Sequence, residues 1–260
     1  MTTLPLPKQA AVPGIPAGRR VNVSTATQLL NAMKNVKDGD VIVLAAGTYN
    51  LGEDLETDSD KGTVVLYGDP KTPYNVKIRV SGSTGTIQSG HGGHLKLVGL
   101  DISNEWIGVY ANNSRMDVLF CNIHDCRDRG VYSSNDSYIF IENCVVRDNN
   151  VSGFYIRCKV DIKNCLVKGN GHGVYMSDGG KATVSGCEIV QNNDGIVINA
   201  SDSFATVTNC NIKDNKSTGV RMYSNAGGEF RNNTLSGNKD GNWSVDSSCK
   251  VTRVGNTPNQ

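Results

Sequence analysis

The chain has 260 residues, with 26 basic and 25 acidic side chains and a formal net charge of +1 at pH 7. A near-neutral chain lacks the positive field that nucleic acids and membrane surfaces attract, so we expect neither as a partner. It holds no apolar run long enough to span a bilayer. The start at 1–8 lacks an apolar core, which predicts synthesis inside the cell without a signal peptide.

Residues 1–20 are rich in proline and show no apolar periodicity. Four of the seven prolines lie here, and such a segment is typical of an extended arm that does not fold alone. We predict that this arm binds a neighbouring protein; a disordered tail is the alternative. The side chains expected to contact the partner are Leu4, Pro5, Leu6, Pro7, Val12, Pro13, Ile15 and Pro16.

A helix is predicted at 25–36, because Thr25 and Gln28 have the spacing of a capping box. The apolar residues that share one face of this helix are Leu29, Leu30, Met33 and Val36. A solenoid exposes core and unpaired strand edges at its end, so we interpret the helix as its cap. Residues 21–260 then form one domain, with early strands predicted at 41–44, 63–67 and 76–80.

One short pattern returns seven times between about Leu95 and Ser248, at steps of 20 to 24 residues. The glycines that open each copy are Gly108, Gly130, Gly153, Gly173, Gly195, Gly219 and, more loosely, Gly241. Two further ladders keep this step: Cys121, Cys144, Cys165, Cys187 and Cys210, and Asn104, Asn149, Asn170, Asn192, Asn215 and Asn238. Three ladders in one register indicate a solenoid.

Around the cysteines, apolar residues alternate with polar ones, as in Val160-Asp161-Ile162. This period of two indicates strands with one buried face, and no segment of the repeat region has helical spacing. About 22 residues accommodate three short strands and three turns. We therefore predict an all-β chain, a right-handed parallel β-helix whose regular coils run from about 95 to 254.

The repeat unit has a recognisable pattern, seen in residues 160–165, then Asn170, then Gly173-Val174-Tyr175. Through them the sequence resembles the pectin-lyase-like β-helix repeat family. The resemblance implies the fold. It leaves the function open, because that family includes lyases, hydrolases, epimerases, viral spikes and non-enzymatic proteins.

The cysteine and asparagine ladders are interpreted as structural. In-register strands hold stacked side chains about 4.8 Å apart, whereas a disulfide needs Cβ atoms about 3.8 Å apart, so we predict free buried thiols. Asparagine suits tight turns and can bond from coil to coil, and Cys126 fills one position of its ladder. We predict no cofactor, and no metal site at His91 and His94, which lack a third ligand nearby.

The strand before each ladder cysteine carries the candidates for an enzymatic function. In many family enzymes this sheet lines a substrate groove, and the best catalytic candidates among its outward residues here are Asp117, Glu142, Asp161 and Lys163. A uronate lyase needs a base and a cation, and a glycosidase needs two carboxylates. A cross-strand ion pair is the simpler interpretation of Glu142 beside Lys163, and short connections leave no walls around a groove. We therefore predict no catalytic residue and keep these four as the alternative.

Four tyrosines are expected to stack on the outside of successive coils: Tyr110, Tyr132, Tyr155 and Tyr175. Contiguous exposed aromatics mark contact surfaces, and tyrosine suits interfaces because it is apolar with a polar tip. We rank an interface with another chain first, a ladder that strengthens its own sheet second, and a platform for sugar rings third.

These features predict a structural or attachment component of a large assembly, with a virus or phage particle as the setting and capsid decoration or a tail as the place. We expect a homotrimer of parallel rods whose arm binds the larger assembly, located in the virion if the protein is viral. The alternatives are a polysaccharide lyase or epimerase acting on uronate-containing glycans, and an intracellular β-helix interaction module. A glycan is the alternative partner.

Overall fold

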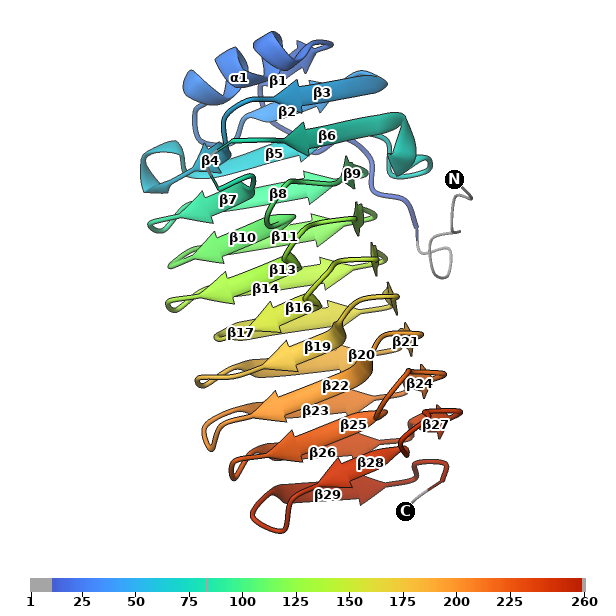
Figure 1. The fold of residues 1–260 in the computed structure, drawn as a ribbon. Coiled ribbons are helices and arrows are strands. Elements are labelled where there is room, and N and C mark those ends of the chain that lie inside the picture. The colour runs from blue at the N-terminus through green and yellow to red at the C-terminus, as the bar shows by residue number, and fades with distance from the viewer. Residues whose placement is uncertain (1–10, 83, 259–260) are drawn as a thin grey trace.

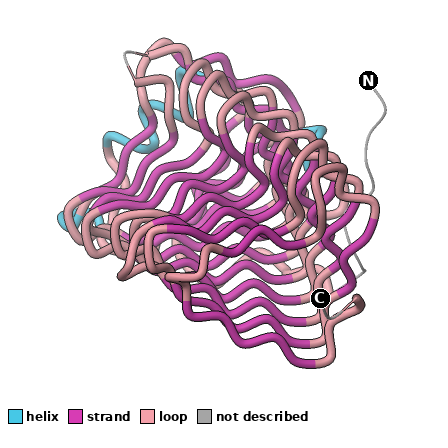
Figure 2. The backbone as a smooth tube through the Cα atoms, turned by 60° about the horizontal axis from the view of Figure 1, so that its bottom comes forward, coloured by secondary structure: helices cyan, strands magenta, loops and turns pink. Residues whose placement is uncertain are grey.

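The computed structural model describes residues 11–82 and 84–258. The chain winds into a rod of stacked coils that runs from the N-terminal to the C-terminal end (Figure 1). Three parallel sheets form the walls of the rod, and the turns between them stack at its corners (Figure 2). The predicted right-handed parallel β-helix is therefore confirmed.

Sheet A has eleven strands in the described residues and sheets B and C have nine each. The strands of sheet A are β1 (Arg20–Val23), β2 (Val41–Leu44), β5 (Thr63–Tyr67), β8 (His94–Val98), β11 (Arg115–Leu119), β14 (Tyr138–Glu142), β17 (Lys159–Lys163), β20 (Lys181–Ser185), β23 (Phe204–Thr208), β26 (Gly227–Arg231) and β29 (Lys250–Val254). Those of sheet B are β3 (Gly47–Leu51), β6 (Val76–Val80), β9 (Asp101–Ile102), β12 (Asn122–His124), β15 (Val145–Arg147), β18 (Leu166–Lys168), β21 (Glu188–Val190), β24 (Asn211–Lys213) and β27 (Thr234–Ser236). Those of sheet C are β4 (Leu55–Thr57), β7 (Ile87–Gly90), β10 (Val109–Asn112), β13 (Arg129–Ser134), β16 (Ser152–Ile156), β19 (His172–Met176), β22 (Asp194–Asn199), β25 (Val220–Tyr223) and β28 (Trp243–Val245).

The helix α1 (Ala26–Lys34) lies at the N-terminal end of the rod, within the range 25–36 predicted for it (Figure 1). The Thr25 hydroxyl accepts a hydrogen bond from the Gln28 backbone N–H at 3.2 Å. The Gln28 side chain accepts from the backbone N–H of Ser24, one residue earlier than a capping box requires. Helix α1 buries Leu29 and Met33 in the core of the first coils. Two single-turn 3-10 helices lie at Ser59–Lys61 and Pro73–Asn75.

Equivalent residues of successive coils stack on one another along each sheet. In sheet A, Val118 pairs with Ile141 and Ile141 pairs with Ile162, and all three side chains are fully buried. The inward faces of the three sheets merge into one continuous core. Each apolar side chain of this size contributes about 1.5–3 kcal/mol by leaving water, so the ladders account for the cohesion of the rod.

The predicted cysteine ladder is confirmed as a column of buried, free thiols. All eight cysteines lie in the described residues and form no disulfide. The Cys121 backbone N–H donates to Cys144 Sγ at 3.3 Å, and that of Cys165 donates to Cys187 Sγ at 3.4 Å. Burial raises the pKa of the Cys144 and Cys165 thiols well above the usual value, which keeps them protonated and unreactive.

Replacing Cys165 by Ser should lower the free energy of unfolding by about 1–3 kcal/mol, because a hydroxyl pairs less well than a thiol in this apolar column. Urea denaturation measures the change. The matched control is Cys158→Ser, because Cys158 is half-buried and should change stability little. Titration of the unfolded chain without reductant should find eight thiols; a lower number would contradict the ladder as described.

The asparagine ladder joins consecutive coils by side-chain hydrogen bonds. The backbone and side-chain N–H groups of Asn149 donate to Asn170 Oδ1 at 3.0 and 2.9 Å. The Cys126 backbone N–H donates to Asn149 Oδ1 at 3.1 Å, so Cys126 does occupy the asparagine position of its coil. The glycine ladder makes room for these bonds: a Cβ on Gly153 would lie 3.0 Å from Asn170 Nδ2 and 2.8 Å from Gly173 O.

The last coil differs from the predicted register. Because Val220 pairs with Trp243, the position of the ladder glycines is occupied by Asn242, and Gly241 lies one residue before it. Trp243 faces the core and packs edge-on against Phe230, with ring centroids 5.1 Å apart. The Arg253 guanidinium lies 4.3 Å from the Trp243 ring centroid, so these side chains cover the C-terminal end of the core.

The part of the predicted arm that the structure describes contacts the rod itself. The Tyr67 hydroxyl donates to the Pro13 carbonyl at 2.8 Å, and the chain enters sheet A at Arg20. Val12 and Ile15 are exposed. Leu4, Pro5, Leu6 and Pro7 lie outside the described residues, so binding of the arm to a neighbouring protein stays a prediction.

Candidate functional site

The outward face of sheet A holds a cluster of ionisable side chains around Asp117. The register places Lys96 of β8 beside Asp117 of β11, and His94 beside Arg115. His94 Nε2 lies 3.0 Å from Asp117 Oδ2, Arg115 Nε donates to Oδ1 at 3.1 Å, and Lys96 Nζ lies 3.5 Å away. Burial opposes the charge of Asp117, but the bonds from His94 and Arg115 outweigh it and hold the pKa of this carboxyl below its usual range.

One coil further on, the Tyr138 hydroxyl donates to Asp161 Oδ2 at 2.7 Å. Burial, together with this bond, raises the pKa of Tyr138 to about 12. Arg115 and Lys159 lie over the Tyr138 ring, at 5.3 and 5.2 Å from its centroid. Asp117 is thus held as an ionised acceptor, and Tyr138 is held as a protonated donor to Asp161.

Glu142 and Lys163 are aligned as predicted, but the predicted ion pair between them is wrong. Both residues are described, they are partners in the register of β14 and β17, and no ion pair joins them. Lys163 Nζ instead lies 5.1 Å from the centroid of the Phe140 ring. A cation–π interaction at an exposed site contributes about 0.5–1 kcal/mol to stability, which is comparable to the contribution of an exposed ion pair.

The four predicted tyrosines do form a column on the outside of sheet C, in which the first and last pairs of rings are stacked and the middle pair is edge-on. Ring centroids are 4.8 Å apart for Tyr110 and Tyr132, 5.5 Å for Tyr132 and Tyr155, and 5.1 Å for Tyr155 and Tyr175. The guanidinium of Arg129 covers both central rings, at 4.9 and 4.2 Å. The rings are half-buried, so stacking within the sheet already covers part of their area.

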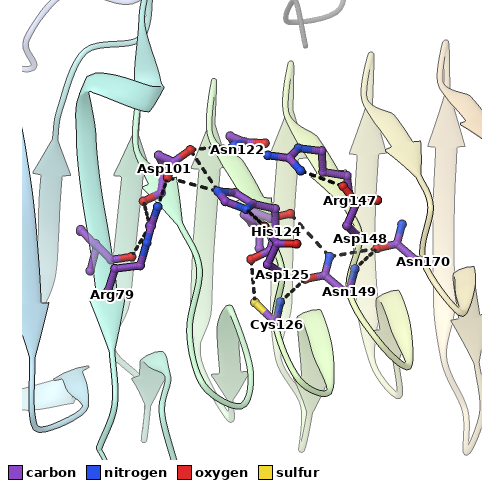
Figure 3. Close-up of polar contacts among 12 residues, drawn as sticks. Arg79, Asp101, Asn122, His124, Asp125, Cys126, Arg147, Asp148, Asn149 and Asn170 are labelled. Atoms are coloured by element: carbon purple, nitrogen blue, oxygen red, sulfur yellow. Dashed lines mark hydrogen bonds and ion pairs between the residues drawn. The ribbon is translucent and has the colours of Figure 1, made fainter. Parts of the chain in front are cut away.

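Sheet B carries a third cluster, in which Asp101 is the common acceptor (Figure 3). The Asp101 carboxylate pairs with Arg79, accepts from Asn122 Nδ2 at 2.7 Å, and lies 3.1 Å from His124 Nε2. The other ring nitrogen of His124 lies 2.6 Å from Asp125 Oδ2. A protonated imidazole can donate to both carboxylates. Asp101 and His124 are each only 4% exposed.

Burial opposes the charge of Asp101, but the bonds from His124, Arg79 and Asn122 outweigh it and hold the pKa of this carboxyl far below its usual range. Beside the cluster lies a cavity of about 410 Å³, lined in part by Arg79, Asp125 and Arg127. The Asp101 carboxylate is already bonded on both oxygens. We therefore interpret this cluster as a clamp between the early coils.

The described residues contain no cluster of three His, Cys, Asp or Glu side chains with the geometry of a metal site. Among the same residues, no helix is both long and apolar enough to cross a bilayer.

The family model described as a right-handed β-helix region matches residues 107–257. The chain belongs to the right-handed β-helix family. Pectate lyase Pel9A superposes on this β-helix with a TM-score of 0.73 at 14% identity, covering 93% of this chain and 80% of the lyase. ORF18 of Geobacillus virus E2 superposes with a TM-score of 0.59 at 14% identity, covering 88% of this chain and 56% of the viral one. An alginate lyase from Paenibacillus sp. superposes with a TM-score of 0.53 at 18% identity, covering 88% of this chain and 99% of the lyase.

A search of the curated proteins gave no match. At these identities the structural likeness is one of fold, and it confirms the resemblance to pectin-lyase-like repeats. The neighbours of this β-helix include both enzymes and a viral protein, so they do not select a function.

Several residues of these clusters were not predicted as functional from the sequence. His94, Arg115 and Tyr138 form the outward column two residues before the column of Asp117. One signal could have revealed them and the sheet B cluster: His94 and Asp117 are 23 residues apart, as are Asp101 and His124. Register partners in these coils are 21 residues apart, so a separation of 23 places the two residues on adjacent strands, two positions out of register and within reach of each other.

Proposed function

We propose that this β-helix is a structural or attachment component of a large assembly, with a virus or phage particle as the setting. The observation that carries the proposal is the bareness of the regular coils. Each described turn from sheet A to sheet B after β8 holds two residues, as Phe120 and Cys121 do between β11 and β12. Catalytic sites are usually built on loops, whereas flat faces bounded by tight turns suit contact with other chains.

The chemistry of sheet A supports the same proposal. Asp117 and Asp161 already accept hydrogen bonds from His94, Arg115 and Tyr138. The Asp117 carboxylate, whose pKa is held below the usual range, is a poor proton acceptor at neutral pH. The fold of ORF18 of Geobacillus virus E2 offers a viral precedent for a rod of this kind.

We further propose a homotrimer of parallel rods with the tyrosine ladder at or near the contact. Light scattering on the purified chain should give the mass of three chains. Tyr132→Asp combined with Tyr155→Asp should shift it toward one, because the two substitutions remove the aromatic area of the contact and place charged groups that must be desolvated there. Thr183→Asp with Thr206→Asp, on the outward face of sheet A, is the matched control and should stay trimeric. A folded wild-type monomer would leave the interface without support.

The arm is proposed to join the rods to the larger assembly. Pro13 and the residues from Gly18 onward contact the rod, so a truncation that spares the rod should end before residue 11. The chain that lacks 1–10 then reports whether this segment is what the assembly binds.

The second candidate is a polysaccharide lyase or epimerase, and the cluster of His94, Arg115 and Asp117 favours it. Such enzymes need a base for the C5 proton and a cation that neutralises the uronate carboxylate. A groove further along sheet A, lined in part by Lys159, Lys181 and Phe204 of β17, β20 and β23, has a volume of about 610 Å³. It therefore offers cations and room for a sugar.

Incubation with pectate, alginate and chondroitin tests this candidate. We expect no unsaturated product and no deuterium at C5 after incubation in heavy water, because the carboxylates of Asp117 and Asp161 already accept hydrogen bonds. Product or exchange that disappears in Asp117→Asn, in Asp161→Asn or in Lys163→Ala would replace the proposed attachment function by the enzymatic one. Glu56→Gln, a substitution away from sheet A, is the control and should leave any activity unchanged.

A further inference from the structure

A pocket lies on the outside of the rod where the tyrosine ladder ends. Its volume is about 330 Å³, within the range of small-molecule sites. The residues that line it are Thr84, Thr86, Gln88, Trp106, Ile107 and Tyr110. Gln88 of β7 is the register partner of Tyr110 of β10, and Trp106 and Ile107 lie in the turn between β9 and β10.

The ladder leaves one face of Tyr110 without an aromatic neighbour. On one side, the Tyr110 ring is parallel to that of Tyr132, with an interplanar angle of 9° and a centroid distance of 4.8 Å. The position one coil earlier in the same column is Gln88, so the stack stops at Tyr110. The face of Tyr110 toward Gln88 therefore has no aromatic neighbour, and both residues line the pocket.

Trp106 provides a second aromatic surface at the same pocket. It is 50% exposed, the largest exposed fraction among the large hydrophobic side chains of the described residues. Exposed aromatics beside a cavity mark binding surfaces. The turn that carries Trp106 is longer than the equivalent turns of the next coils, which have four residues between β12 and β13 and between β15 and β16.

The polar groups of the pocket are neutral. Of the described side chains that line it, none is charged: they contribute two hydroxyls of threonine, one amide and the tyrosine hydroxyl. The Thr84 hydroxyl already donates to Asp54, and Thr86 is fully buried. The amide of Gln88 has no hydrogen-bond partner among the described residues, so it can both donate and accept toward a ligand. The Tyr110 hydroxyl is held by Ser134 at 2.8 Å, which fixes the ring.

We propose that this pocket binds one neutral pyranose ring of a glycan, stacked on the open face of Tyr110 and against Trp106. A pyranose has an apolar C–H face that packs on the negative face of an aromatic ring, and hydroxyls at its rim that pair with amides and hydroxyls. A uronate or a phosphate would need a cation, and the lining has none. That the glycan serves as a receptor rests on the proposed attachment function. That the pocket binds a sugar does not depend on it.

The two tryptophans of the chain make the site directly observable. Trp243 packs on Phe230 at the opposite end of the rod, so Trp243→Phe leaves Trp106 as the only reporter of fluorescence. This variant is titrated with neutral hexasaccharides of glucose, mannose and N-acetylglucosamine, and with hexagalacturonate as the charged comparison. We expect a saturable change in emission with at least one neutral sugar and none with the charged one.

Calorimetry on the full chain then assigns the binding to the pocket. Trp106→Ala and Gln88→Ala should each weaken the neutral sugar at least about tenfold, whereas Phe204→Ala, which removes an exposed aromatic ring of sheet A, should not. Unchanged thermal unfolding verifies that the variants are folded. Absence of saturation with all three neutral sugars up to about 5 mM, equal affinity in Trp106→Ala, or binding of hexagalacturonate alone would overturn the proposal. The number of chains given by light scattering is measured separately, so the failure of either proposal is recognised on its own.

Discussion

Replacing Asp101 by Asn should lower the free energy of unfolding by about 3–5 kcal/mol at pH 7. Removing one member of a buried ionic cluster leaves its partners without compensation, here Arg79 and the buried ring of His124. Urea denaturation measures the loss. Asp148→Asn is the matched control, because Asp148 is exposed and pairs only with Arg147; it should change stability by less than about 1 kcal/mol.

The same substitution should alter how stability depends on pH. The pKa of Asp101 in the folded chain lies below that of an unfolded Asp, about 3.9. Its contribution is therefore fully present above about pH 4 and is lost as the pH falls toward the folded pKa. The difference in stability between wild type and Asp101→Asn should shrink below about pH 4. A difference that stays constant down to pH 2 would show that the charge of Asp101 does not stabilise the fold.

Replacing Asn170 by Ala should cost about 3–5 kcal/mol, because several buried groups lose their partners at once. Asn170 Oδ1 accepts two bonds from Asn149, and Asn170 Nδ2 donates to the Val146 carbonyl at 3.1 Å. Thermal and urea unfolding measure the loss. The control is Asn150→Ala on the equivalent turn of the preceding coil; its side chain is exposed, so the substitution should change stability by less than about 0.5 kcal/mol. Equal effects at both positions would contradict the ladder as a source of stability.

The fold could be predicted from the sequence because the number of residues per coil is nearly constant. Strands that pair in register turn each structural position into a column of equivalent residues, so Gly153, Cys165 and Asn170 are each one member of a visible series. Even the early strands at 41–44, 63–67 and 76–80 are observed at those bounds, because runs of β-branched residues mark them.

The clusters could be predicted less well, and the reasons are local. Arg79 and Asp101 lie before the regular ladders, where an eight-residue turn from β5 to β6 hides the step between coils. Phe120 has a left-handed φ of 55°. The equivalent residues of the next two coils are Asn143 and Asn164, the residue type that favours this conformation. A phenylalanine gives no sign in the sequence that the backbone turns here. Trp106 lies in a turn, where no alternation indicates which way a side chain points.

Glu142 and Lys163 show a further limit. Their register was predictable, but the conformation of a long side chain is chosen among neighbours of similar energy, here Glu142 and the ring of Phe140. The register of the strands determines which residues are adjacent. It does not determine which of two adjacent residues a long side chain contacts.

The pairing of each strand only with its equivalents one coil before and one coil after has a consequence for how such rods diverge. A segment that extends from one ladder position to the next can be gained or lost as a unit: Asn143-Cys144 and Asn164-Cys165 stand at identical places in their coils. Removing one of these turns together with the strands up to the next turn, residues 143–163, would join an equivalent strand to an equivalent turn and shorten the rod by about 4.8 Å. Length in this architecture is therefore a quantity that varies in whole coils, while the two ends, with helix α1 and Trp243, stay the same.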